Sequence, residues 1–267
     1  MKTGKIEEIR IEEIEEMETD TMSKLEKVFD TPNKKAFIGF LTAGDPDADS
    51  TVQFILEMEK AGAEGVVIQE ANIRSLGNGM TTDGVFEIVK RVREQSQIPL
   101  AFMTYVNPVF HYGYEKFFTK CEELGISAII IPDVPYEEKA EVEAPAKTHG
   151  VKVISMIAPT SESRIRQIAS EAEGFIYVVS SMGVTGVRSE IKTNLPAIVE
   201  SIRTVTDVPC AIGFGISTPE QAKAMASISD GAIVGSAIVK IIAKYGKDAA
   251  PYIGEYVKSM KEAVAEA

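Results

Sequence analysis

Two glycine-rich turns are the part of this sequence whose residue types and spacing best fit a chemical task. The segments IGFGIST (212–218) and IVGSAIVK (233–240) each place small residues between an apolar run and an amphipathic one. Glycine lets the backbone approach an anion closely, and the free N–H groups at the start of a helix attract negative charge. The segment SMGVTG (181–186) is expected to add N–H donors through Gly183 and Gly186. The turns therefore predict a phosphate site made of backbone groups, with Gly213, Phe214, Gly215, Gly235 and Ser236 as its main residues.

The cysteines and histidines do not have the spacing of a metal site. Cys121 and Cys210 lie far apart without a CxxC pair, and only His111 and His149 could add imidazole ligands. A structural zinc site needs four such ligands close together, so no metal is predicted. Each cysteine lies in an apolar pattern, which predicts a buried and unreactive thiol.

Eight short apolar runs, rich in β-branched residues, alternate with longer amphipathic segments from Ala36 onward. This alternation is typical of repeated βα units, and eight parallel strands close an α/β TIM barrel. Such barrels often bind phosphate after strands seven and eight, where the two glycine turns fall. A doubly wound open sheet is the alternative fold. The expected strands span residues 36–44, 65–69, 99–105, 126–133, 151–158, 174–181, 209–215 and 231–236.

Length, hydrophobic content and net charge favour a single globular domain and argue against some classes of partner. The chain has 267 residues, 45% of them hydrophobic, and a formal net charge of -12. This size suits one barrel domain, and the acidic balance argues against nucleic acid or an anionic membrane as partner. Residues 1–21 form an acidic extension without a signal-peptide core, and residues 22–267 are expected to form the barrel. No apolar stretch approaches the roughly 20 residues of a membrane span, so we expect a cytoplasmic protein.

Six motifs occur together and in order along the chain: FLTAGDP, MTYVNP, PDVPYEE, SMGVTG, GFGIS followed by PEQ, and GSAIVK. From about Met22 to the C-terminus the sequence resembles the tryptophan synthase alpha chain family. The resemblance implies a TIM-barrel lyase of tryptophan biosynthesis, which cleaves indole-3-glycerol phosphate reversibly to indole and glyceraldehyde 3-phosphate. It also implies a β subunit as partner, bound at the barrel mouth and carrying pyridoxal phosphate, and no cofactor in this chain itself.

Site residues follow from the resemblance position by position. The glycine turns and Gly186 are similar to the family's phosphate group, and Phe40, Met103 and Tyr177 resemble the walls of its indole pocket. Taken alone, those three side chains are more typical of ordinary barrel packing than of a pocket. The positions that resemble the loops facing the β subunit are Asn107, Pro108 and Asp133.

The resemblance fails at the second strand. The family carries a catalytic glutamate on that strand and a catalytic aspartate in the following loop. Neither carboxylate has a match in this sequence, where Glu64 is followed directly by GVVIQ (65–69). The simplest alignment removes the segment between Glu64 and Gly65, whereas an ungapped one puts a valine in place of the glutamate. We expect GVVIQ to replace the second strand, with a helix almost at once, a shortened loop, and a barrel less stable than that of a complete relative. Neither Glu64 nor Glu70 is expected to take over the proton transfer.

Three functions remain open at this point. The first is the family's lyase activity, with the cleavage step lost or nearly lost because the carboxylates have no match. The second is a non-catalytic partner that binds a phosphate ligand and regulates a β subunit. The third is another phosphate-binding barrel, which would need its own charged strand-end residue, and only Asp45 and Asp133 are available. The SMGVTG and MTYVNP motifs argue against this third function.

Overall fold

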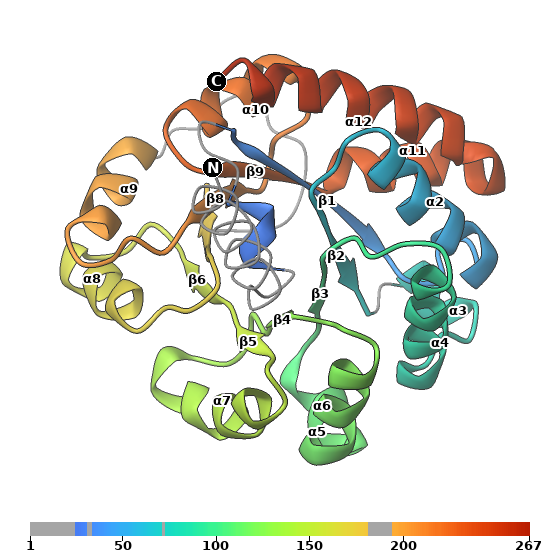
Figure 1. The fold of residues 1–267 in the computed structure, drawn as a ribbon, viewed down its shortest axis with the longest axis horizontal. Helices are drawn as coiled ribbons and strands as arrows, with labels where there is room; N and C mark the ends of the chain where they lie inside the picture. The colour runs from blue at the N-terminus through green and yellow to red at the C-terminus, as the bar shows by residue number, and fades with distance from the viewer. Residues whose placement is uncertain (1–24, 31–33, 71–72, 181–193) are drawn as a thin grey trace, which may run out of the picture.

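The computed structural model describes residues 25–30, 34–70, 73–180 and 194–267, and within them nine parallel strands form one sheet. The strands lie in the order β5-β4-β3-β2-β1-β9-β8-β7-β6, and the sheet curls into a barrel inside a ring of helices (Figure 1). The acidic extension and Gly186 lie outside the described residues. The strands are β1 (Ala36–Thr42), β2 (Gly65–Gln69), β3 (Leu100–Met103), β4 (Ala128–Ile130), β5 (Lys152–Val153), β6 (Ser155–Ile157), β7 (Ile176–Val179), β8 (Cys210–Gly213) and β9 (Gly231–Val234).

The first and last strands of this order are the two halves of one barrel strand. Only Ile154 separates β5 from β6, and β5 pairs with β4 whereas β6 pairs with β7. The backbone N–H of Ile154 donates to the carbonyl of Ile129 at 2.8 Å, which continues the ladder to β4. The barrel therefore closes through residues 152–157. The eight predicted runs are confirmed as its eight strands, and the doubly wound alternative is excluded.

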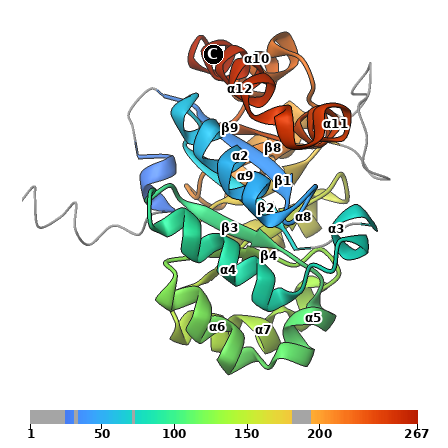
Figure 2. The same cartoon turned by 90° about the vertical axis from the view of Figure 1, so that its right-hand side faces the viewer.

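Helices cover the outside of the barrel, as the side view also shows (Figure 2). Several begin at the polar residues expected of N-caps: Asp47 accepts from the N–H of Ser50 at 2.8 Å, and Thr218 and Gln221 cap each other's backbone. The helical segments are η1 (Glu26–Val28), α2 (Ala48–Lys60), α3 (Ile73–Gly77), α4 (Thr82–Arg93), α5 (Val106–Tyr112), α6 (Tyr114–Glu123), η2 (Tyr136–Glu138), α7 (Lys139–Thr148), α8 (Glu162–Ser170), α9 (Leu195–Arg203), α10 (Pro219–Ser227), α11 (Ser236–Tyr245), η3 (Gly246–Ala249) and α12 (Ala250–Ala265).

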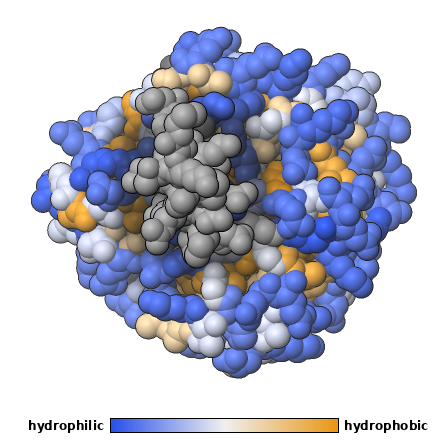
Figure 3. Space-filling model, viewed as in Figure 1, coloured by the Kyte–Doolittle hydropathy of each residue, from blue (hydrophilic) through white to orange (hydrophobic). Residues whose placement is uncertain are grey.

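Hydrophobic side chains fill two layers. Inside the barrel, strand residues such as Ile38, Val67 and Ile233 meet one another, because alternate residues of a strand point to the same face. Between the sheet and the helices a larger cluster includes the buried rings of Phe54 and Phe117. The outer surface is mostly hydrophilic in the face that Figure 3 shows, with hydrophobic residues in separate patches.

The predicted fate of the two thiols is confirmed. Cys121 and Cys210 are both fully buried. Burial raises the pKa of the Cys121 thiol far above its usual range and raises the pKa of Cys210 to about 12, so both stay protonated and unreactive. Among the described residues, no three or more of His, Cys, Asp and Glu gather as metal ligands. None of the described helices is both long enough and apolar enough to cross a membrane.

The segment GVVIQ takes the second place in the barrel, as expected. It forms β2 and pairs along its length with β1, where Phe40 lies opposite Val67, and with β3, where Val67 lies opposite Ala101. β2 has five residues and is not shorter than β3, which has four. The following helix, α3, begins at Ile73 and so leaves a connection of three residues. β2 is paired on both edges, so the sheet is not opened at this position.

Candidate active site

A cavity of about 410 Å³ opens at the carboxyl ends of the barrel strands. Its described lining contains seven of the residues predicted for the phosphate and indole sites, together with residues that were not predicted. The predicted ones are Phe40, Met103, Tyr177, Phe214, Gly215, Gly235 and Ser236. The others are Thr42, Gln69, Ile216, Ile233, Val239 and Lys240. The fold thus brings both predicted glycine turns and the predicted apolar walls to one cavity.

The first glycine turn leaves β8 in an unusual backbone conformation. Phe214 and Gly215 both have positive φ, 73° and 77°, and for phenylalanine this conformation is costly. The end of β7 holds the turn in place, because Ser180 donates its hydroxyl to the carbonyl of Phe214 at 2.6 Å and its N–H to that of Gly213 at 3.1 Å. The Phe214 ring packs edge-on to Tyr177 with centroids 5.7 Å apart. The turn is therefore held in a fixed shape at the pocket.

The second glycine turn joins β9 to α11. α11 begins at Ser236 and runs for 10 residues, so its first backbone N–H groups and its positive dipole end lie at the cavity. A methyl group on Gly235 would lie 2.7 Å from Cδ1 of Phe40, so glycine is what allows the turn to lie against that ring. Gly213 has the same role beside Tyr177, whose hydroxyl would be 2.3 Å from an added methyl. Gly213 thus supports the pocket from the end of β8 without itself lining it.

The apolar part of the pocket comes from β1, β3, β7 and β9. Met103 and Tyr177 are buried, and Phe40 is half-buried at the cavity. Full desolvation raises the pKa of the Tyr177 phenol far above its usual range, so this group remains neutral. These walls can hold an aromatic ring, but they supply no general base at neutral pH.

Gln69, the last residue of β2, is the polar side chain that the sequence did not single out. It lies directly opposite Thr42 of β1, whose hydroxyl donates to Oε1 of the Gln69 side-chain amide at 3.3 Å. Val67, two residues earlier and on the same face of the strand, is buried inside the barrel. The predicted strand 65–69 had the observed bounds, but its residues Gly65 to Ile68 are buried on both faces, so the apolar pattern did not show that Gln69 faces the cavity.

The two glutamates on either side of β2 face away from the cavity. Glu64 precedes β2 at the opposite end of the barrel, where it accepts from the N–H of Phe37 at 2.8 Å and forms an ion pair with Lys261. Glu70 is buried outside the barrel and accepts hydrogen bonds from the hydroxyls of Thr82 and Thr104. Neither glutamate lines the cavity, which agrees with the expectation that neither takes over the proton transfer.

The two strand-end aspartates are also engaged elsewhere. Asp45 is buried and accepts two-pronged hydrogen bonds from Arg74 of α3, the shortest being 2.6 Å. Asp133 accepts from the N–H of Val106 at 3.0 Å and so caps the start of α5. Neither aspartate lines the cavity, and none of its described lining residues is a carboxylate.

The residues expected to face a partner lie together beside α5. Asn107 and Asp133 are exposed and Pro108 is half-buried. Two large aromatic side chains accompany them, because Tyr105 is 58% exposed and Phe110 is 60% exposed. Exposed aromatic residues are enriched at protein interfaces, so this surface has the composition of a docking site.

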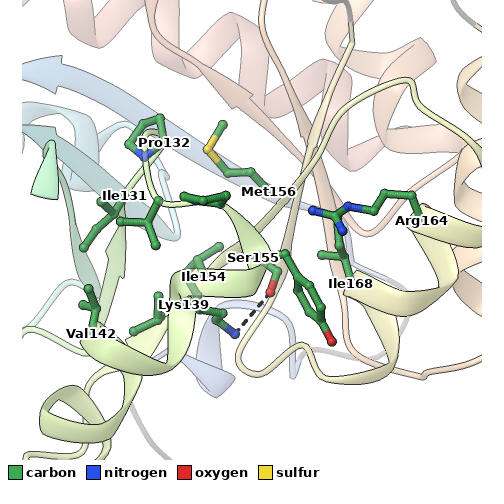
Figure 4. A pocket seen from close by; sticks show the side chains of 13 residues that line it. Ile131, Pro132, Lys139, Val142, Ile154, Ser155, Met156, Arg164 and Ile168 are labelled. Atoms are coloured by element: carbon green, nitrogen blue, oxygen red, sulfur yellow. Dashed lines mark hydrogen bonds between the residues drawn. The ribbon is translucent and has the colours of Figure 1, made fainter.

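A second, smaller cavity of about 210 Å³ lies outside the barrel at the divided strand, between α7 and α8 (Figure 4). Lys139 points into it toward Ser155, with 3.4 Å between the ammonium and the hydroxyl. The charged groups here are already paired within the chain: Lys139 with Glu143 at 2.9 Å, and Arg164 with Glu137. The Arg164–Glu137 pair joins α8 to η2 across the divided strand, whereas the Lys139–Glu143 pair lies within α7. With these charges paired inside the chain, the cavity is a packing feature and not a ligand site.

Comparison with known proteins gives a consistent result. A sequence model of the tryptophan synthase alpha chain family matches residues 27–265. The alpha chain of Lacticaseibacillus casei is 44% identical over 257 residues, which covers 91% of this chain and 96% of that protein. The alpha chain of Lactiplantibacillus plantarum is 43% identical over 258 residues, with coverage of 91% and 97%. The crystal structure of the alpha subunit from Legionella pneumophila superposes with a TM-score of 0.82 at 28% identity, covering 92% of this chain and all of the other.

Proposed function

Because this chain belongs to the tryptophan synthase alpha chain family, we propose that its mouth cavity binds indole-3-glycerol phosphate and cleaves it to indole and glyceraldehyde 3-phosphate. One observation carries the proposal: two glycine turns and an aromatic wall share a cavity of about 410 Å³. The backbone N–H groups of Gly215, Gly235 and Ser236 would hold the phosphate. Phe40 and Met103 would enclose the indole ring, with Gly186 adding to the phosphate group.

Cleavage requires three proton movements. The bond between indole C3 and the glycerol chain breaks as the neighbouring hydroxyl loses its proton and becomes the aldehyde. C3 gains a proton, and the ring nitrogen loses its proton and regains one when the bond breaks. Paired carboxylates are a usual means for such transfers. Among the described lining residues, the uncharged polar side chains are the amide of Gln69, the hydroxyls of Thr42 and Ser236, and a neutral phenol at Tyr177, and none of them is a carboxylate. We therefore expect binding to be retained and cleavage to be much slower than in a complete relative.

The proposal includes the absence of the segment that bears the family's carboxylates. The alignment with the L. casei relative is 257 residues long although it covers only 91% of a chain of 267 residues, so it is longer than the stretch of this chain that it covers. The three-residue connection from β2 to α3 supports the same interpretation. The sequence of that connection, Glu70-Ala71-Asn72, contains no aspartate.

A β subunit is the proposed partner, and it would bring the pyridoxal phosphate that this chain itself does not need. A structure of the tryptophan synthase α2β2 complex of Pyrococcus furiosus contains a chain similar to this one, with a TM-score of 0.76 at 29% identity. The surface of Asn107, Pro108 and Asp133, with the exposed rings of Tyr105 and Phe110, is the proposed contact. The pathway places the protein in the cytoplasm.

One observation favours a second function, a non-catalytic partner that regulates a β subunit. The described lining of the pocket has no carboxylate, whereas the ligand site and the α5 surface are both present. A single experiment separates the two. Indole release from indole-3-glycerol phosphate is measured for this chain alone and with a β subunit, beside the L. casei alpha chain, while calorimetry measures binding. Slow turnover supports the lyase, binding that stimulates the β subunit without indole release supports the regulator, and absence of binding contradicts both.

A further inference from the structure

Lys240, the last residue of the GSAIVK motif, is a charged residue of the cavity to which the proposed function gives no role. It lies on α11, four residues after Ser236, and lines the same cavity as the two glycine turns. Residues four apart on a helix lie on the same side, with about 5–6 Å between their Cβ atoms. The Lys240 side chain therefore starts one helical turn farther along α11 than the proposed phosphate position at Ser236. Its four-carbon stem is long enough to reach back toward that position.

The charge of Lys240 is available, unlike that of other cations near the carboxyl ends of the strands. Arg74 pairs with Asp45 at 2.6 Å, Lys247 with Asp47 at 2.6 Å, and Lys139 with Glu143 at 2.9 Å. Within the described residues, Lys240 forms no ion pair, and its side chain is exposed at the mouth of the cavity. The chain as a whole has a net charge of -12, so its overall field does not attract an anion, and the ammonium of Lys240 supplies a positive charge locally beside the proposed anion site.

We infer that Lys240 adds a side-chain positive charge to the phosphate cradle and so selects dianionic phosphate monoesters over uncharged ligands. The inference rests on the proposed function, which places a phosphate between the two glycine turns. The backbone N–H groups and the dipole of α11 orient the phosphate but carry only partial charges. A full charge one turn away adds a Coulomb attraction that acts on the phosphate and leaves the indole ring unaffected.

The test compares Lys240→Met with Lys244→Met. Lys244 lies one turn farther along α11, does not line the cavity, and holds its ammonium 4.7 Å from the Tyr245 ring centroid. The two variants therefore change the net charge equally and on the same helix, so a difference between them reports position. Dissociation constants are measured by calorimetry for indole-3-glycerol phosphate, inorganic phosphate and indole, at low salt and at high salt, with Lys240→Arg as the conservative variant.

We expect Lys240→Met to weaken binding of both phosphate ligands about fivefold at low salt, and high salt to reduce the difference, because salt screens an exposed charge. Lys244→Met should match the wild type, Lys240→Arg should stay close to it, and indole should bind all variants alike. Wild-type affinity in Lys240→Met, or equal losses in both methionine variants, would overturn the inference. Failure of the proposed function would give a different result. Inorganic phosphate would still bind in a Lys240-dependent way, but indole-3-glycerol phosphate would bind no more tightly than inorganic phosphate.

Discussion

The contact between Gly235 and Phe40 gives the sharpest test of how the pocket is built. A methyl group added at Gly235 would lie 2.7 Å from Cδ1, 2.9 Å from Cγ and 3.0 Å from Cβ of Phe40. Since the clash reaches down to Cβ, which the β1 backbone fixes, the ring cannot relieve it by a rotation alone. Gly235 has a negative φ of -126°, so it does not lie in the left-handed region that favours glycine, and the contact with Phe40 is the main obstacle to Gly235→Ala.

The magnitude follows from the cost of overpacking. An extra methyl group in a well-packed site costs about 1–3 kcal/mol. In a chain of this size each kcal/mol lowers the Tm by roughly 2–4 °C, so Gly235→Ala should unfold about 5 °C lower than the wild type. Its affinity for indole-3-glycerol phosphate should fall about tenfold, because the displaced ring and turn both belong to the ligand site.

A double-mutant cycle with Phe40→Ala isolates the cause. Removing the ring takes away Cγ and Cδ1, so adding the methyl in that background should cost much less than in the wild type. Gly77→Ala is the matched control, because an added methyl there meets no atom within 4 Å. A Gly235→Ala variant with the Tm and affinity of the wild type, or equal losses in both backgrounds, would refute the packing account.

Three further outcomes test other parts of the structure. Gln69→Glu places a carboxylate at the one polar position that β2 offers to the cavity, so indole release should rise about tenfold or more; unchanged turnover would contradict this. Thr104→Val removes a hydroxyl that donates to the buried Glu70, and urea unfolding should show a loss of about 1–3 kcal/mol. Asp47→Asn keeps an N-cap but loses the pairing with Lys247 that lowers the Asp47 pKa from 3.8 to about 2. That pairing stabilises the fold above pH 4 and is lost as the pH falls toward 2, so the variant should lose less stability over this range than the wild type, and parallel acid-unfolding curves would refute the assignment.

The sequence predicted the barrel well because its signal is repeated. Eight apolar runs alternate with amphipathic ones, and each run corresponds to a barrel strand. The division of the run 151–158 at Ile154 could not be predicted, because it reflects a change of pairing partner from β4 to β7 and leaves the local apolar pattern intact. Pairing between strands far apart in sequence depends on barrel curvature, which composition does not encode.

At the site, backbone chemistry was more predictable than side-chain direction. The turns at Gly215 and Gly235 were found from glycine spacing alone, and both reach the cavity. The sequence did not single out Gln69, and Gly213 serves as packing space beside Tyr177 instead of lining the pocket. β2 was predicted with its observed bounds, but its residues Gly65 to Ile68 are buried on both faces, so the apolar pattern does not indicate which side chains point into the barrel.

The divided fifth strand separates the chain into two half barrels. Strands β1 to β5 form one contiguous half and β6 to β9 the other, and among the described strands the β1–β9 ladder is the one that hydrogen-bonds across them. The proposed ligand site draws on both, with Phe40, Gln69 and Met103 from the first half and Tyr177 and Gly235 from the second. A bound ligand therefore acts as a clamp between the halves: amide hydrogens along β1 and β9 should exchange more slowly when it is present, and two fragments cut after Ile154 should assemble more readily in its presence than without it.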